Sequence, residues 1–215
     1  MSPLDYAKQI CYSSEEVLMF SYETAKKYAD KPGVYVECGV AAGAQIIAMA
    51  HGAPNKMIYA FDSFEGIPLP SNRDDQMPGI KFLSKEEIEA LPNPGEQELI
   101  TTGATSVSVT DFWFSLERTN INTENICSVK GWFEETVQSF TDPISILRLD
   151  GDLYNSTYVC LEHLYKLVIK GGIVIIDDWD LPGCRAAVQD FMKNTDQFNK
   201  IIPISGNSGP SYFIK

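Results

Sequence analysis

Two pairs of acidic residues follow two apolar runs in the second half of the chain, which cover residues 144–149 and 173–176. The first pair is Asp150 and Asp152, and the second is Asp177 and Asp178. Carboxylates held close together repel one another, so such a group needs a cation, shared protons or basic partners. An all-oxygen set with no histidine nearby suits Mg²⁺, Mn²⁺ or Ca²⁺ better than zinc.

The segment between these two runs has the spacing of a helix. Its apolar residues are Val159, Leu161, Leu164, Leu167 and Val168, and the pair Gly171-Gly172 is expected to end the helix. Strand, helix and strand form a βαβ unit, in which the two strands lie parallel in one sheet. Both acidic pairs are therefore expected at the carboxyl edge of that sheet, where open α/β sheets bind their ligands.

A second unit of this kind is predicted nearer the start of the chain. A short apolar strand at 34–38 leads into the turn Gly39–Gly43, a helix at 44–50 and a strand at 57–61 that ends in Asp62. This spacing suits a turn that meets the polar tail of a nucleotide and an acid that holds ribose hydroxyls. Neither a G-x-G-x-x-G fingerprint nor a P-loop is present, so a pyrophosphate is disfavoured. Glu37 beside the turn suits a ligand with a positive amino group.

The rest of the chain supplies further helices and strands and one irregular stretch. Helices are predicted at 14–29, 110–118 and 184–193, a short one at 134–140, and strands at 126–129, 200–204 and 211–215, the last two forming an antiparallel edge hairpin. Residues 66–107 are rich in proline and contain one short helical pattern at 84–91. A stretch of this length inside a compact domain predicts a lid-like insertion in a single domain that covers 1–215.

Composition limits the classes of partner. The 215 residues carry a net charge of −12, which argues against nucleic acid or an anionic membrane as a partner. Five cysteines without a C-x-x-C pair favour a reducing compartment, and no apolar stretch reaches membrane-spanning length. With no signal-peptide pattern at the N-terminus, a cytoplasmic protein is expected.

Four motifs together resemble the macrocin O-methyltransferase family. They are VECGVAAGAQ, FDSFEGIP, VKGWFEET and LRLDGDLYNST…GGIVIIDDW, and they span about residues 31–193. The resemblance implies an α/β, Rossmann-like class I methyltransferase with a seven-stranded, mostly parallel sheet of order 3-2-1-4-5-7-6. It also implies S-adenosylmethionine and Mg²⁺ as cofactors, with Mn²⁺ or Ca²⁺ as substitutes. The chain departs from the family at Ala44-Gln45, where relatives usually carry small hydroxyl residues.

The resemblance also assigns roles to individual residues. Glu37, Gly39 and Gly43 would bind the methionine part of the cofactor, and Asp62 would bind its ribose hydroxyls. The residues that would flank the adenine are Ser63, Phe64, Lys130, Gly131 and Trp132. The metal ligands are Asp150, Asp177 and Asp178. Asp152 is the first choice for the general base because Asp150 is committed to the metal, and the two can exchange roles.

The predicted function is therefore metal-dependent O-methylation of a hydroxyl on a sugar or glycosylated small molecule. The expected partner of the protein is that small-molecule acceptor, and a homodimer is compatible with the sequence. A catechol or phenol O-methyltransferase of the same fold is the first alternative. A metal-dependent glycosyltransferase is another, because Asp150-Gly151-Asp152 is a D-x-D motif, and a non-catalytic nucleotide-binding module is the third.

Overall fold

A computed structural model describes residues 1–74, 102, 104–197, 199–206 and 209–215. Seven strands form one sheet of order β3-β2-β1-β4-β5-β7-β6. They are β1 (Val34–Cys38), β2 (Ile58–Asp62), β3 (Ile126–Lys130), β4 (Ile144–Leu149), β5 (Val168–Ile176), β6 (Ile202–Pro203) and β7 (Ser211–Ile214). The first five are parallel, and β7 runs antiparallel to both β5 and β6. The predicted fold class, strand order and edge hairpin are confirmed.

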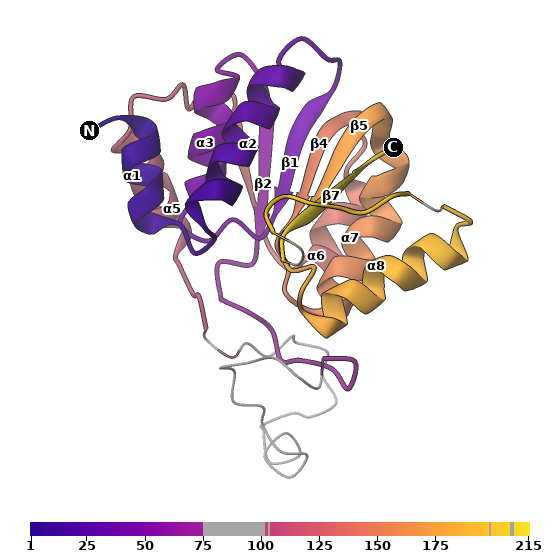
Figure 1. Cartoon of the computed structure of the whole chain (residues 1–215). Coiled ribbons are helices and arrows are strands. Elements are labelled where there is room, and N and C mark those ends of the chain that lie inside the picture. Colours follow the sequence, from indigo (N-terminus) through magenta and orange to yellow (C-terminus); the bar gives the residue numbers. More distant parts are fainter. Residues whose placement is uncertain (75–101, 103, 198, 207–208) are drawn as a thin grey trace.

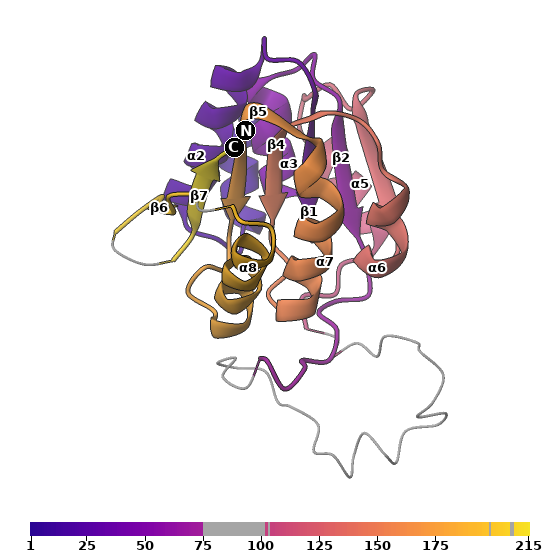
Figure 2. The same ribbon diagram turned by 90° about the vertical axis from the view of Figure 1, so that its right-hand side faces the viewer.

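Helices cover both faces of the sheet, as Figures 1 and 2 show from two directions. One face carries α1 (Pro3–Ile10), α2 (Glu15–Tyr28), α3 (Ala44–Gly52) and α5 (Val109–Glu117). The other carries α6 (Phe133–Thr136), α7 (Tyr154–Leu164) and α8 (Pro182–Asn194), with short 3₁₀ turns at 137–139 and 165–167. Each layer buries its own apolar cluster against the sheet. Cover on both faces explains why the central strands are apolar almost throughout.

Helix α1 was not predicted, although the sequence carries a start signal for it. Ser2 accepts a hydrogen bond from the Asp5 backbone N–H at 3.2 Å, and the Asp5 carboxylate accepts one from the Ser2 N–H at 3.4 Å. Together with Pro3 in the first turn, this capping box begins the helix. Ala7 is buried in the core cluster on this face. The helix thereby places the following residues, 10–13, at the carboxyl edge of the sheet.

The prediction that Gly171-Gly172 ends a helix was wrong. Helix α7 already ends at Leu164, and both glycines lie inside β5. Gly171 has φ +74°, its N–H donates to the Lys215 carbonyl at 2.6 Å, and the Lys215 N–H donates to the Gly172 carbonyl at 3.0 Å. The β4–β5 register shifts beside this point. The glycines therefore lie in an irregular part of β5, where a residue with a Cβ would be strained.

Most of the predicted lid-like insertion, including the helix expected at 84–91, lies outside the described residues. Its two described ends meet each other, because the Ile67 N–H donates to the Ala104 carbonyl at 3.0 Å and the Thr102 N–H donates to the Ile67 carbonyl at 2.8 Å. Asp74 then reaches α7, where its carboxylate accepts the Tyr154 N–H at 2.7 Å. Within the described residues, no helix combines the length and the apolar character needed to cross a membrane.

Candidate active site

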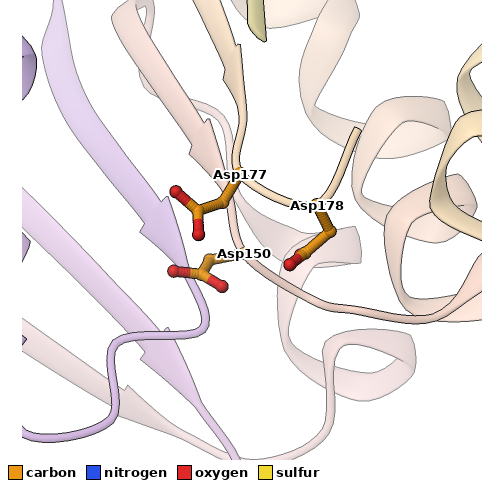
Figure 3. Close-up of side chains that lie close together, drawn as sticks. All are labelled: Asp150, Asp177 and Asp178. Carbon is orange, nitrogen blue, oxygen red and sulfur yellow. The ribbon is translucent and has the colours of Figure 1, made fainter. Parts of the chain in front are cut away.

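The acidic pairs meet because β4 and β5 are parallel neighbours whose backbone pairing continues past their ends. The Asp150 N–H donates to the Cys38 carbonyl at 2.8 Å, and the Asp177 N–H donates to the Leu149 carbonyl at 2.9 Å. Asp150, Asp177 and Asp178 each offer a carboxylate oxygen, and these oxygens all lie within 4.8 Å of one another (Figure 3). The predicted convergence of these three carboxylates is therefore present in the fold.

Arg148 supplies a positive charge directly beneath the acids. Its side chain is fully buried, with Nη1 2.8 Å from Asp150 Oδ2 and Nη2 2.5 Å from Asp177 Oδ1. Arg148 is not among the site residues predicted from the sequence. The available signal was a lone arginine inside an apolar strand, two residues before Asp150 and thus on the same face of the sheet.

Glu37 is the register partner of Arg148 across β1 and β4. Its side chain is 1% exposed, and its Oε1 lies 3.3 Å from Arg148 Nη1. Its Oε2 has no hydrogen-bond partner in the part of the chain that the structure describes. Burial raises the pKa of Glu37 to about 8 against the opposing effect of Arg148, and the charges of Asp177 and Asp62 add to the rise.

One guanidinium does not balance the acids around it. Burial, followed by the charge of Asp177, raises the pKa of Asp150 well above its usual range, even though 29% of that side chain is exposed. Burial and the neighbouring aspartates do the same for Asp178. Burial and Asp177 raise the pKa of Asp152 to about 6. The site therefore either holds protons or binds a cation.

The donor set fits a hard divalent ion. Asp150 Oδ1 and Asp178 Oδ1 make no hydrogen bond with the described residues, whereas Asp178 Oδ2 accepts the Asp152 N–H at 2.9 Å. Asp177 is more occupied, because Oδ1 faces Arg148 and Oδ2 accepts the Ser13 hydroxyl at 3.0 Å. Free carboxylate oxygens on two strands match the chemistry of Mg²⁺.

A cavity of about 300 Å³ opens in front of this edge. Its size lies at the lower end of the range for small-molecule sites. Nine predicted site residues line it: Glu37, Gly39, Asp62, Ser63, Trp132, Asp150, Asp152, Asp177 and Asp178. Four others do not: Gly43, Phe64, Lys130 and Gly131. The glycine turn and the acidic cluster thus share one space.

The two glycines of the turn serve different contacts. Gly39 has φ +87°, and a Cβ there would lie 1.8 Å from the Asp150 carbonyl oxygen. Gly43 has φ +85°, precedes α3, and a Cβ there would lie 2.7 Å from Leu116 Cδ1 on α5. Gly39 therefore allows the turn to approach the acidic loop, whereas Gly43 allows helix packing behind the cavity.

Asp62 fastens the glycine turn to the end of β2. Its Oδ2 accepts the N–H groups of Val40 and Ala41 at 2.8 and 3.0 Å, and its Oδ1 accepts the Phe64 N–H at 2.7 Å. Asp62 is also one of the residues that line the cavity. The Phe64 ring turns into the core instead, with its centroid 5.6 Å from that of Phe112.

The structure adds lining residues that the sequence analysis missed. They include Ile10 at the end of α1, Cys11, Tyr12 and Ser13 between α1 and α2, Gln45 at the start of α3, and Glu134 and Ser156. The Ser13 bond to Asp177 joins the N-terminal segment to the acids. No local pattern marks residues 10–13 as part of a site, because only the docking of α1 brings them there.

The strand order and the helices on both faces of the sheet give the chain the Rossmann-like fold of class I methyltransferases. More narrowly, the macrocin-O-methyltransferase family (TylF) matches residues 23–208, and this chain belongs to that family.

The chain is 32% identical to an 8-demethyl-8-(2,3-dimethoxy-alpha-L-rhamnosyl)-tetracenomycin-C 4'-O-methyltransferase from Streptomyces olivaceus, over 74% of this chain and 58% of that protein. It is 29% identical to a mycinamicin III 3''-O-methyltransferase from Micromonospora griseorubida, over 80% and 65% respectively. The chain thus spans about three-fifths of the length of these curated relatives. The solved O-methyltransferase NovP is 26% identical, with a TM-score of 0.74 over 94% of this chain and 80% of NovP.

Proposed function

We propose that this protein transfers a methyl group from S-adenosylmethionine to a hydroxyl of a sugar or glycosylated small molecule, with a divalent metal ion at the acidic cluster. One observation carries the proposal: the turn with Glu37 and Asp62 opens into the same cavity as Asp150, Asp177 and Asp178. A methyl donor and an acceptor hydroxyl can therefore lie side by side. Membership of the family and the names of both curated relatives support this activity.

The cofactor's charges match the lining of the cavity. Glu37 has a buried carboxylate oxygen without a partner among the described residues, which suits the cofactor's ammonium group. Asp62 is assigned to the ribose hydroxyls through the lone pairs that the backbone N–H groups leave free. Ser63 and Trp132 line the cavity for the adenine. Gly43 and Phe64 pack behind the cavity, whereas Lys130 and Gly131 lie at the end of β3 without lining the cavity.

Asp150, Asp177 and Asp178 would hold Mg²⁺, with Mn²⁺ or Ca²⁺ as substitutes. Such an ion, when bound, lowers the pKa of an adjacent hydroxyl. Arg148 holds Asp150 and Asp177 in position from below. Arg148 donates to Oδ2 of Asp150, so Oδ1 of Asp150 stays available to the ion.

Asp152 is proposed as the general base, with Asp150 as the alternative. It lines the cavity, and its backbone N–H is held by Asp178. The acceptor oxygen attacks the methyl carbon, the carbon–sulfur bond breaks, and the hydroxyl proton passes to the Asp152 carboxylate. A pKa of about 6 suits a proton acceptor that works near neutral pH.

The test is methyl transfer to a panel of glycosylated acceptors and a catechol, with and without chelator. We expect S-adenosylhomocysteine to form with glycosylated acceptors, to stop with chelator and to return with Mg²⁺. Full transfer in excess chelator would remove the metal from the proposal. Transfer to the catechol alone would favour the phenol alternative.

Variants separate the roles of the acids. D177N and D178N should abolish turnover while S-adenosylhomocysteine still binds, because the cofactor's proposed contacts lie on β1 and β2. D152N should lower kcat and leave metal affinity nearly intact. D180N is the matched control, since Asp180 is an exposed acid in the same loop. Full activity of D152N would shift the base to Asp150.

A further inference from the structure

Gln45 carries a buried acceptor that nothing described so far uses. It is the second residue of α3, 5% exposed, and it lines the cavity. Its Oε1 has no hydrogen-bond partner in the described part of the chain, and its Nε2 donates to Cys11 Sγ at 3.7 Å. A buried carbonyl oxygen without a hydrogen bond is destabilising, so a ligand donor at this point would be favourable.

Glu37 Oε2 is the second unpartnered acceptor that belongs to a lining residue of this cavity. Cys11 lies beside Gln45, because its thiol accepts the Gln45 amide hydrogen bond, and burial raises the pKa of that thiol, with smaller contributions from the charges of Asp177 and Glu37. No lysine or arginine is among the described lining residues. The two unpartnered acceptors, Glu37 Oε2 and Gln45 Oε1, therefore suit a ligand group that donates several hydrogen bonds. An ammonium group, with three N–H donors and no acceptor, has that chemistry.

We infer that the Gln45 carbonyl binds the α-amino group of the methyl donor together with Glu37, and so sets the protein's preference for a cofactor that carries this group. The inference rests on the proposed function and deepens it. Glu37 supplies charge, whereas Gln45 supplies a second, neutral acceptor from a different element. The amino group is thereby held between β1 and the first turn of α3.

Calorimetry with two probes tests the inference. One is S-adenosylhomocysteine, and the other is the same molecule without its α-amino group. Gln45→Met keeps the length of the side chain and removes its acceptor. It should weaken S-adenosylhomocysteine binding about tenfold or more, the scale of a hydrogen bond to a charged group, and leave binding of the deaminated probe unchanged.

Two further variants complete the design. Ser21→Ala removes another buried, unpartnered oxygen that does not line the cavity, and it should change neither affinity. Gln45→Glu keeps an acceptor at the same place, so it should retain the preference for the amino-bearing probe. This second variant carries the test if Gln45→Met does not fold.

Each result has a definite meaning. Equal loss for both probes in Gln45→Met would show that the side chain acts by packing and would overturn the inference. Unchanged affinity in the folded variant would do the same. If the unaltered protein bound neither probe, the proposed function itself would fall. If it bound both probes equally, the proposed function would stand and the role of the amino group would be refuted.

Discussion

At the scale of single residues, the site is built on a buried arginine that serves three carboxylates. Arg148 lies against Glu37, Asp150 and Asp177 with a fully buried side chain. Burial of a charge is tolerated only where partners compensate it, so this network has a strong effect on stability as well as on the orientation of the acids.

Replacement of Arg148 by methionine should destabilise the protein strongly. The change leaves buried carboxylates without their cation, which costs about 3–5 kcal/mol of the free energy of unfolding. Urea unfolding at neutral pH measures this loss. Lys26→Met is the control, because Lys26 pairs with Glu23 on the surface and such a pair contributes about 1 kcal/mol at most. A loss below that of the control would show that Arg148 does not hold the acids.

Glu37 should make stability fall as pH rises. Its pKa in the folded state is about 8, above the ordinary value of 4.5, so the folded state binds more protons than the unfolded state between these limits. Stability from neutral Glu37 is present below about pH 4.5 and is lost progressively up to about pH 8. The full loss is roughly 5 kcal/mol, at 1.36 kcal/mol for each of the 3.5 pH units between the two pKa values.

Glu37→Gln provides the comparison for this slope, since glutamine resembles the neutral carboxyl group. The difference in free energy of unfolding between the two proteins is measured by urea titration at several pH values. It should shift in favour of the variant as pH rises. A difference that is constant across this range would mean that Glu37 is ionised throughout.

At the scale of elements, Asp74 connects the chain after β2 to the helices that follow the acidic loops. Its carboxylate is 2% exposed, accepts the Tyr154 N–H at the start of α7 and accepts both donors of Ser71. A Cβ on Gly183, in the first turn of α8, would lie 2.0 Å from its Oδ1. Asp74 thus packs against the first turns of the two helices that follow the loops bearing Asp152 and Asp178.

Gly183→Ala should reveal this contact through a double-mutant cycle. In the unaltered protein the new methyl group clashes with Asp74, and overpacking of this kind costs about 1–3 kcal/mol. In an Asp74→Ala background the space is free, so the same change should cost much less. Urea unfolding of the four proteins measures the coupling. Additive effects would show that the two residues do not share this space.

At the scale of the whole molecule, one cavity spans β1, β2, β4 and β5, so ligands bound there should stabilise the entire fold. S-adenosylhomocysteine at 100 times its Kd should add about 2.7 kcal/mol, which raises Tm by about 5–10 °C in a chain of this size. At a fixed ligand concentration, the gain should be larger at pH 8 than at pH 6, because the ligand's ammonium group binds better to ionised Glu37. Calorimetric unfolding scans measure both effects. A Tm that does not respond to the ligand would contradict the proposed cofactor site.

Local pattern was enough to predict most of the helices and strands and the edge of the sheet at which the acids lie. Period and turn residues predicted the strands and the convergence of Asp150, Asp177 and Asp178, because parallel neighbours end at the same edge. The strand order came from the resemblance to the family. Local pattern was not sufficient to predict the structure at Gly171, because glycine is common both at the end of a helix and in an irregular part of a strand. The choice depended on pairing with Lys215, at the far end of the chain.

Tertiary structure decided how the acids are held and what else faces them. Arg148 meets Glu37 only because β1 and β4 pair in one particular register, and a shift by one residue would turn the two side chains to opposite faces. Likewise, docking of α1 brings Ser13 to Asp177, 164 residues away in the sequence. Sequence determined which residue types end each strand, whereas contacts between distant segments depend on register and packing, which no local pattern contains.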